Sequence, residues 1–347
     1  MQDPVESRIL GVYWPKASSM PQRTRKPLAD LHNHLGASVR PSILWSIAHR
    51  QGIKLPTKSY WEFEEMITMR GKERNRNLGE MHERFFRWTE LIQSSPEAIE
   101  ESVKAVIDGA YRRGNIVLHE LRFNPMKRNR GGERDLDNII MSAVWGMDKA
   151  LLEYPQVKAG LILIMDRGFP PEQNMILVEK AIKYKDRGVV GIDMAGPNHP
   201  KFSMKKHLPH FKKARAAGLG ITVHTGEERQ LDEMRFVVEE VRPDRIGHGV
   251  QCVRNKALMR RVAELGITLE ICPTSNLKNS VLPDVRALKQ TFAALTAHGV
   301  PFVLCTDGPE MYQTHLHQEQ EFLISRGILT AAQVEQARKH AFKVSFV

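Results

Sequence analysis

The 347-residue sequence contains few cysteines: Cys252, Cys272 and Cys305. Their number is odd, and none of them belongs to a Cys-x-x-Cys pair. This usage argues against a disulfide framework and fits a reducing compartment, so we expect a cytoplasmic protein. Cys305 lies within an apolar run, where we expect it to act as a small buried hydrophobic side chain.

Long apolar runs are missing as well. None approaches the roughly 18 residues that span a bilayer, and the N-terminus has no basic segment followed by an apolar stretch. The sequence therefore indicates neither a membrane protein nor a secretory signal. Hydrophobic residues make up 41% and charged residues 26%, as in globular proteins. A chain of this length can form two ordinary domains or one large α/β barrel.

Acidic residues are outnumbered by basic ones, which gives a net charge of +11. Basic clusters occur at 70–76 and 127–134. Such a balance favours anionic partners, nucleic acid among them. However, the chain has no basic strand with interleaved aromatics and no helix-turn-helix pattern, so we expect no nucleic-acid partner. The remaining interpretations are a solvated basic surface and an anionic small-molecule substrate. No pattern in the sequence indicates an oligomeric state.

From residue 28 onward, short apolar runs alternate with longer amphipathic stretches. The short runs are rich in Val, Ile and Leu, as strands buried on both faces are. Eight strands are predicted: Leu28–His34, Ile116–Phe123, Lys158–Asp166, Val189–Met194, Ile221–His224, Arg245–His248, Thr268–Ile271 and Phe302–Thr306. The stretches between them predict helices that end at Gly or before Pro: Pro96–Arg113, Asp135–Glu153, Glu172–Asp186, Met204–Ala217, Gln230–Val241, Asn255–Glu264 and Asp284–His298.

This repeated unit of helix, stop residue and short strand predicts an α/β fold, a (β/α)8 TIM barrel. The rival fold, a doubly wound open sheet, is favoured by a Gly-x-Gly-x-x-Gly loop after the first strand, and that loop is absent. Residues 1–27 lack periodicity and are predicted to form an irregular N-terminal arm, with 28–347 as a single barrel. An insertion at about 41–95, with helices at Pro41–Gln51 and Leu78–Ile92, follows the first strand and can cover the site.

Side chains suited to metal binding follow several of these strands, and function in such barrels collects at the strand C-terminal ends. The first strand ends in His32 and His34, whose i, i+2 spacing turns both side chains to one side. The fifth strand ends at His224, and Asp307 follows the eighth. Three imidazoles and a carboxylate aimed at one point predict a metal site with a position left open for water.

Two further residues are candidates for proton transfer. His248 ends the sixth strand between two glycines, which let backbone and substrate come close, and it suits a general base. Glu227 follows His224 at the mouth of the fifth strand. A carboxyl group held protonated there could donate to a ring nitrogen of a substrate. The alternative for Glu227 is a cap on the following helix.

Six motifs in order carry a resemblance to a known family: His32-x-His34, Gly191-Ile-Asp-Met-Ala-Gly196, His224-x-Gly-Glu227, Arg245-Ile-Gly-His248-Gly, Glu270-Ile-Cys-Pro-Thr-Ser-Asn276 and Thr306-Asp307. From about residue 28 to its C-terminus, the sequence resembles the adenosine/AMP deaminases, a zinc-dependent branch of the amidohydrolase barrels. The resemblance implies hydrolytic deamination of an aminopurine nucleoside, nucleotide or related amino-substituted heterocycle, with release of ammonia.

The resemblance also implies roles for individual residues. It implies one Zn²⁺ per chain with four ligands: His32, His34, His224 and Asp307. Glu227 would donate a proton to purine N1, and His248 would assist the attacking water. Gly196 would offer its backbone N–H to the purine. Ser275 and Asn276 would support the site from behind the ligands.

Two positions depart from the pattern of adenosine-type members. Gly308 stands where an acidic residue usually contacts the purine, and the loop that contains Gly36 lacks the carboxylate that usually holds the ribose. Each lost hydrogen bond typically costs about 1–3 kcal/mol, so adenosine is expected to be a poor substrate. Glu310 could reach into the space at Gly308, and we include both, with Gly196, as candidate substrate-binding residues. A nucleotide or another anionic group is favoured if one of four arginines lies close: Arg70, Arg74, Arg76 or Arg122.

Two other functions stay open. A binuclear amidohydrolase acting on a cyclic amide or ester commonly has a carboxylated lysine at the end of strand four, but the segment Gly191–Gly196 has no lysine. A non-catalytic relative that binds a nucleoside would be expected to have lost a metal ligand or a proton carrier, and all six candidates are present.

Overall fold

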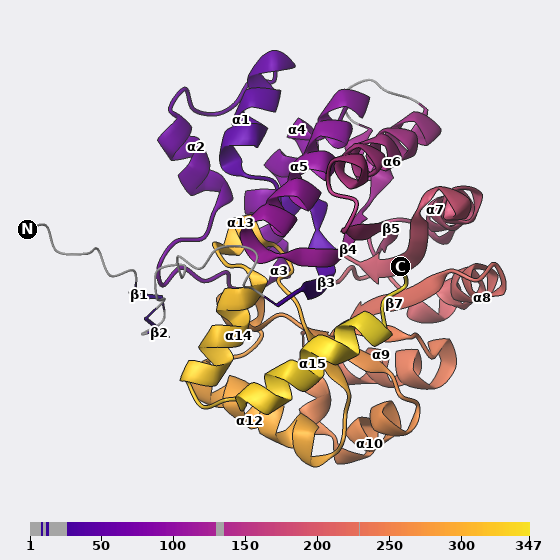
Figure 1. The fold of residues 1–347 in the computed structure, drawn as a ribbon. Coiled ribbons are helices and arrows are strands. Elements are labelled where there is room, and N and C mark those ends of the chain that lie inside the picture. The colour runs from indigo at the N-terminus through magenta and orange to yellow at the C-terminus, as the bar shows by residue number, and fades with distance from the viewer. Residues whose placement is uncertain (1–7, 10–11, 14–25, 130–134, 229) are drawn as a thin grey trace, which may run out of the picture.

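Eight parallel strands form one sheet in the order β10-β9-β8-β7-β6-β5-β4-β3. The computed structural model describes residues 8–9, 12–13, 26–129, 135–228 and 230–347. Helices surround the strands, as the ribbon shows (Figure 1). The strands occur where they were predicted, several with the predicted bounds: β3 (Leu28–His34), β4 (Ile116–Phe123), β5 (Lys158–Asp166), β6 (Val189–Ala195), β7 (Gly220–Thr225), β8 (Arg245–His248), β9 (Thr268–Ile271) and β10 (Phe302–Leu304).

The barrel closes at a seam between its first and last strands. There β3 and the segment after β10 are joined by an isolated bridge between Asn33 and Asp307. The backbone N–H of His34 donates to the carbonyl of Asp307 at 2.7 Å, and the N–H of Asp307 donates to that of His32 at 2.8 Å. The closure therefore fixes the backbone of the histidine pair against the backbone of the aspartate.

The helices of the repeat also match the prediction, with adjustments at their ends. The predicted helices at 172–186 and 204–217 each include a 3₁₀ turn, and the one at 230–241 finishes as a π-helical turn, η7 (Val237–Val241). The helices of the repeat are α5 (Pro96–Gly114), α6 (Leu136–Glu153), α7 (Pro171–Lys183), α8 (Leu208–Ala216), α9 (Leu231–Phe236), α10 (Lys256–Glu264) and α12 (Val285–Ala297). Four helices beyond the sixth strand were not predicted: α11 (Pro273–Lys278), α13 (Pro309–Tyr312), α14 (Leu316–Ser325) and α15 (Ala331–Lys343).

Local sequence explains how α5 begins and ends. The hydroxyl of Ser95 accepts from the backbone N–H of Ala98, and Pro96 occupies the first turn, where its missing N–H costs nothing. The predicted stop was Gly114, but the helix includes that residue and ends at Asn115, which adopts the left-handed conformation (φ 49°). Asparagine tolerates this conformation because its short side chain bonds locally.

The insertion between β3 and α5 is helical. It contains α1 (Pro41–Arg50), the unpredicted α2 (Tyr60–Ile67), α3 (Leu78–Met81), the π-helical turn η3 (His82–Phe86) and α4 (Arg87–Ile92). Helices α1 and α2 lie to one side of the barrel (Figure 1). A small apolar cluster joins η3 to α13 across the top: Ala37, Met69, Met81, Phe85, Phe86, Met311 and Tyr312.

The two chain ends contact the barrel differently. Within the predicted arm 1–27, Arg8–Ile9 (β1) and Val12–Tyr13 (β2) pair antiparallel; most of that arm lies outside the described residues. At the other end, the Phe346 ring lies 3.5 Å from the Arg245 guanidinium. The tail therefore covers a charged side chain inside the barrel. Among the described residues, no helix is both long and apolar enough to cross a membrane.

A buried lysine ties the insertion to the barrel and predicts a pH effect on stability. The Lys278 ammonium is fully buried and donates to the carbonyls of Met69 and Tyr312. Burial lowers its pKa to about 8. Between about pH 8 and about pH 10.4 the unfolded chain binds the proton that the folded chain has lost, so stability should rise with pH across that window by about 3 kcal/mol from this group.

Urea unfolding at stepped pH values measures this effect. In Lys278→Met the titrating group is absent, so the rise across the window should be smaller than in the parent chain. Parallel stability curves for the two proteins would contradict the assignment.

Candidate active site

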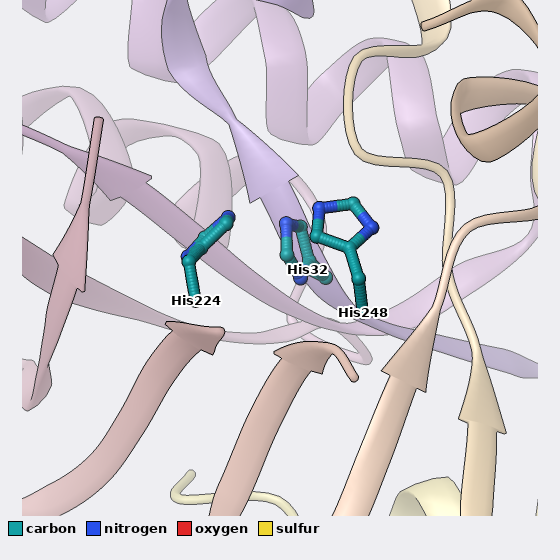
Figure 2. Close-up of side chains that lie close together, drawn as sticks. All are labelled: His32, His224 and His248. Atoms are coloured by element: carbon teal, nitrogen blue, oxygen red, sulfur yellow. The ribbon is translucent and has the colours of Figure 1, made fainter. Parts of the chain in front are cut away.

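Four predicted side chains meet at the C-terminal ends of the strands. The Nε2 atoms of His34 and His224 lie 3.1 Å apart. The Oδ1 atom of Asp307 lies 3.6 Å from Nε2 of His34 and 3.8 Å from Nε2 of His32. Figure 2 shows His32, His224 and His248 grouped at the strand ends. The fold therefore brings together residues that lie up to 275 positions apart in the sequence, His32 and Asp307.

The nitrogen and oxygen atoms of this cluster are better suited to binding a divalent cation than to hydrogen bonding with one another. The Nε2 atom of His32 is buried and has no hydrogen-bond partner among the described residues. The Nε2 atoms of His34 and His224 face each other at 3.1 Å. In neutral rings at least one of these two nitrogens can offer a lone pair to a cation. Imidazole nitrogens and one carboxylate oxygen are the donor set that zinc accepts.

Two alternative groups of donors approach closely around the same point: His32 with His224 and His248, and His32 with Cys272 and Asp307. Both groups contain His32, so they describe one centre, and they give no support to a second metal beside it. Burial raises the pKa of the Cys272 thiol well above its ordinary value, which disfavours the thiolate that a metal requires.

Carboxylates behind the histidines fix the orientation of their rings. Nδ1 of His32 lies 2.7 Å from Oε2 of Glu270. Nδ1 of His224 lies 2.9 Å from Oδ2 of Asp193. A carboxylate on the far nitrogen sets the tautomer, so that Nε2 of each ring presents its lone pair to the cluster.

These carboxylates belong to a fully buried charge network that the sequence analysis missed. Arg122 donates to Asp193 at 3.0 Å and to Glu270 at 2.9 Å. Arg245 donates to Glu270 at 2.7 Å and also to Glu120. All five side chains have no solvent exposure. The signal in the sequence was Glu120 and Arg122, two charged residues at alternate positions of the predicted strand Ile116–Phe123.

The two candidate proton carriers face each other beside the predicted metal ligands. Nε2 of His248 lies 3.5 Å from Oε1 of Glu227 and 3.9 Å from Oδ2 of Asp307. Glu227 is 6% exposed, and burial, with the negative charge of Asp307, raises its pKa well above the ordinary value. Helix α9 starts later, at Leu231, after Gln230, so Glu227 does not act as its cap.

The predicted supporting residues lie in contact with the site. The Asn276 side-chain amide lies 2.9 Å from Nδ1 of His248. The Ser275 hydroxyl donates to Oδ2 of Asp307 at 2.5 Å. His248 and Asp307 adopt positive φ angles of 62° and 65°. Such backbone costs about 1–3 kcal/mol per residue and persists where surrounding contacts enforce it.

The pocket above this cluster, here called the strand-end pocket, is covered by the insertion. Its lining includes Gly196, whose φ of 98° lets the backbone pass close to the Asp166 carboxylate. The cover consists of Leu78, Met81, His82 and Phe86 from α3 and η3. The His82 and Phe86 rings stack with centroids 4.8 Å apart. The free volume is about 60 Å³.

Two of the three candidate substrate-binding residues lie away from this pocket. The expectation that Glu310 fills the space at Gly308 is not met, because Glu310 turns away to pair with the Arg113 guanidinium. A Cβ atom on Gly308 would lie 2.4 Å from that of Ala37, so close packing demands glycine there. Neither residue lines the strand-end pocket, whereas Gly196 does.

Three of the four arginines proposed for an anionic substrate are engaged elsewhere, and the fourth does not line the pocket. Arg122 reaches the pocket wall but belongs to the buried network. Arg70 pairs with Glu64 and Glu65, and Arg74 donates to backbone carbonyls of the 282–283 segment. Arg76, like Arg70 and Arg74, is not among the residues that line the pocket. The cations that line it are instead Lys127 and Arg128, from the second basic cluster.

Comparison with known proteins supplies the family. A sequence profile of adenosine deaminase matches residues 27–347. The chain belongs to the adenosine deaminase family. The adenosine deaminase of Shewanella denitrificans is 30% identical to it over 324 residues, which cover 92% of this chain and 94% of that protein. Membership makes the protein a hydrolase of C–N bonds that deaminates adenosine-like purine compounds, which disfavours the non-catalytic alternative.

Solved structures share the barrel of this adenosine deaminase family member. Arabidopsis N6-mAMP deaminase superposes with a TM-score of 0.79 at 24% identity, covering 92% of this chain and 93% of that one. An amidohydrolase from Burkholderia ambifaria, solved with bound Zn, gives a TM-score of 0.80 at 22% identity, covering 92% and 86%. These similarities confirm the predicted (β/α)8 barrel.

The carboxylates behind the histidines generate a prediction about metal retention. In Glu270→Gln the charge that holds Nδ1 of His32 is lost, and both network arginines lose a counter-charge. We expect zinc affinity to fall about 10–100-fold, measured by elemental analysis after dialysis against a graded chelator. Glu319→Gln is the matched control, because Glu319 is equally buried but bonds to Thr274 and Thr314. Full retention of zinc by Glu270→Gln would contradict the role given to Glu270.

Proposed function

We propose that this protein is a zinc-dependent aminohydrolase that removes the exocyclic amine of an aminopurine nucleoside or nucleotide. One observation carries the proposal: three imidazole Nε2 atoms and the Asp307 carboxylate converge beside a buried carboxyl group and a further imidazole. The family assignment supports deamination of purine compounds in general. The cation, its number and the particular substrate are the further content of the proposal.

Four residues would hold the cation, one per chain: His32, His34, His224 and Asp307. When bound there, zinc would lower the pKa of water to about 7 and so supply a nucleophile near neutral pH. The donor set supports this choice, because it combines nitrogen and oxygen ligands with an orphaned, buried Nε2 on His32. Glu270 and Asp193 would keep those nitrogens directed at the cation.

Glu227 would protonate the purine ring. Its carboxyl group is buried near the negative charge of Asp307, an environment that favours the neutral, hydrogen-bond-donating form. Donation to a ring nitrogen makes the adjacent carbon more electrophilic as water attacks. Gly196, which also lines the pocket, would donate its backbone N–H to an acceptor on the edge of the ring.

His248 would receive the proton of the attacking water and pass it toward the leaving amine. The Asn276 amide contacts its Nδ1 atom at 2.9 Å. Rotation of that amide by half a turn exchanges its oxygen and nitrogen, so Asn276 can satisfy Nδ1 whether or not it carries a proton. The ring can therefore hold its proton on either nitrogen while its position stays fixed, as a group that takes and returns a proton requires.

Substrate entry would require the cover over the strand-end pocket to move. Its free volume of about 60 Å³ is far below the roughly 300–1,000 Å³ of typical ligand sites. The segment that must move is α3 with η3, a π-helical turn of the kind that recurs at functional sites.

An anionic group on the substrate would lie against Lys127. The ammonium group lines the pocket and lies 2.5 Å from Oδ2 of Asp166. Arg128 lies deeper and pairs with Glu90. Gly36 has no side chain, and this leaves room for the Arg128 guanidinium. A Cβ atom at position 36 would lie only 2.9 Å from it. The loop that contains Gly36 thus lacks the carboxylate expected near the ribose, and a cation lies close by instead. This difference favours a nucleotide over a nucleoside as substrate.

Replacing the proposed proton donor tests the reaction. Glu227→Gln keeps the shape of the side chain but removes the acidic proton, so kcat for ammonia release from an aminopurine should fall about 10²–10⁴-fold. Glu228→Gln changes the neighbouring carboxylate and should retain activity. Equal rates for the two variants would remove Glu227 from the mechanism.

Elemental analysis separates this enzyme from a binuclear one. One zinc per chain is expected here, and two in a binuclear amidohydrolase.

A substrate panel tests the choice of a nucleotide. Adenosine, AMP and N6-methyl-AMP are compared for kcat/KM, and the phosphorylated compounds should be preferred. In Lys127→Ala, loss of a charged hydrogen bond should raise KM for AMP about 10–100-fold, with little change for adenosine. Lys339→Ala, an exposed lysine on α15, is the control. Adenosine as the best substrate, or equal effects of Lys127→Ala on both compounds, would overturn the nucleotide assignment.

A further inference from the structure

A second cavity of about 400 Å³ lies on the other side of the barrel seam. We call it the seam cavity. It is bounded by the outer face of β3 and β4, by α5, and by the segment that runs from α13 into α14. None of its lining residues lines the strand-end pocket. A volume of this size falls within the range of small-molecule sites in proteins.

The inner wall of the seam cavity carries a histidine with unused hydrogen-bonding capacity. His119 on β4 is 1% exposed, and neither ring nitrogen has a partner among the described residues. It stands beside Asp30 in the register of β3 and β4. An unpaired buried polar group costs about 1–3 kcal/mol, so its retention points to a partner that binds from the cavity.

A second unpaired atom faces the same space. Oδ1 of Asn33 is buried without a partner among the described residues, while its Nδ2 atom donates to the Thr306 hydroxyl at 3.1 Å. The cavity wall therefore offers an acceptor from Asn33, and His119 offers one donor and one acceptor in its neutral form.

Two carboxylates of the wall are already paired with arginines. Glu310 pairs with Arg113, and Glu64 pairs with Arg70. Asp30 accepts from the hydroxyl of Thr306 and from the amide of Asn33. Asp30 thus has only neutral partners, and an anion entering the cavity would meet no unpaired positive charge among the described lining residues. The remaining lining is apolar and suits the faces of a ring: Val106, Ala110, Ile116 and Leu316.

We propose that the seam cavity is a second ligand site, which takes a small uncharged ring compound carrying both N–H donors and acceptors. The ring lies between the apolar side chains, its N–H groups meet Asn33 and His119, and its acceptor meets the N–H of His119. The site stands independently of the catalytic assignment, because no residue that carries it takes part in the proposed reaction.

The site lies directly behind the metal ligands. Asn33 separates His32 from His34, and Thr306 precedes Asp307. The two segments meet at the bridge between Asn33 and Asp307, and the Asn33 amide also donates to Thr306. A ligand that bonds to Asn33 therefore contacts the backbone that positions the histidine pair.

Calorimetric titration of the full-length protein with three probes tests the proposal: nicotinamide, cytosine and adenine. At least one should bind with a Kd below about 1 mM, since about −4 kcal/mol is modest for a ligand of this size. In His119→Phe the Kd should rise at least tenfold, and in Ala110→Trp, which fills the cavity from α5, binding at this site should be lost. His298→Phe and Ala287→Trp, which lie outside the cavity, are the matched controls and should bind as the parent does.

Thermal melting separates a ligand site from a structural role. Without ligand, His119→Phe should melt no lower than the parent, because the substitution removes two unpaired buried nitrogens. A structural role for His119 predicts the reverse, a lower melting temperature with unchanged binding. The proposal is overturned by that result, by binding of none of the probes, or by binding that neither His119→Phe nor Ala110→Trp weakens.

Discussion

Ion pairing inside the barrel is the constraint on which the site geometry depends. Two guanidinium groups and three carboxylates lie there without solvent exposure. Removing one partner from such a buried set typically costs about 3–5 kcal/mol, because the charge left behind has no water to solvate it. Glu270 is shared by Arg122, Arg245 and His32. The same carboxylate therefore balances the interior charge and orients the His32 ring, a proposed metal ligand, so neither role can change without the other.

The barrel seam adds a second constraint. Most neighbouring strands are joined by ladders, whereas β3 and the segment after β10 meet at an isolated bridge. Asp307 adopts a left-handed backbone at this meeting, where its N–H and carbonyl both bond to the histidine segment. The geometry of the proposed metal ligands is thus tied to closure of the fold. The Asn33 side chain behind that closure contacts Thr306, which extends the same unit to the outer surface of the barrel.

Much of the fold and part of the site could be predicted from sequence, for a physical reason. Apolar strands and helix stops are local signals, and parallel strands in a closed barrel bring their C-terminal ends together whatever the loops contain. The convergence of His32, His34, His224 and Asp307 follows from that alone. Helices α14 and α15 were missed because they come after the last strand, where the alternating pattern that located the others has ended.

Side-chain partners could not be predicted, because they come from distant parts of the chain. Arg122 suggested an anion site, but its partners are Asp193 and Glu270 on other strands. Glu310 suggested a substrate contact, but Arg113 on α5 holds it elsewhere. In both cases a charge that looked available was already neutralised. The same rule bears on the strand-end pocket, where Lys127 lies against Asp166. An anionic substrate of the proposed kind would have to compete with that carboxylate, so its affinity would reflect the difference between two charged contacts. Under the proposed function, that difference would give the enzyme selectivity between charged and uncharged purines without requiring tight binding of either.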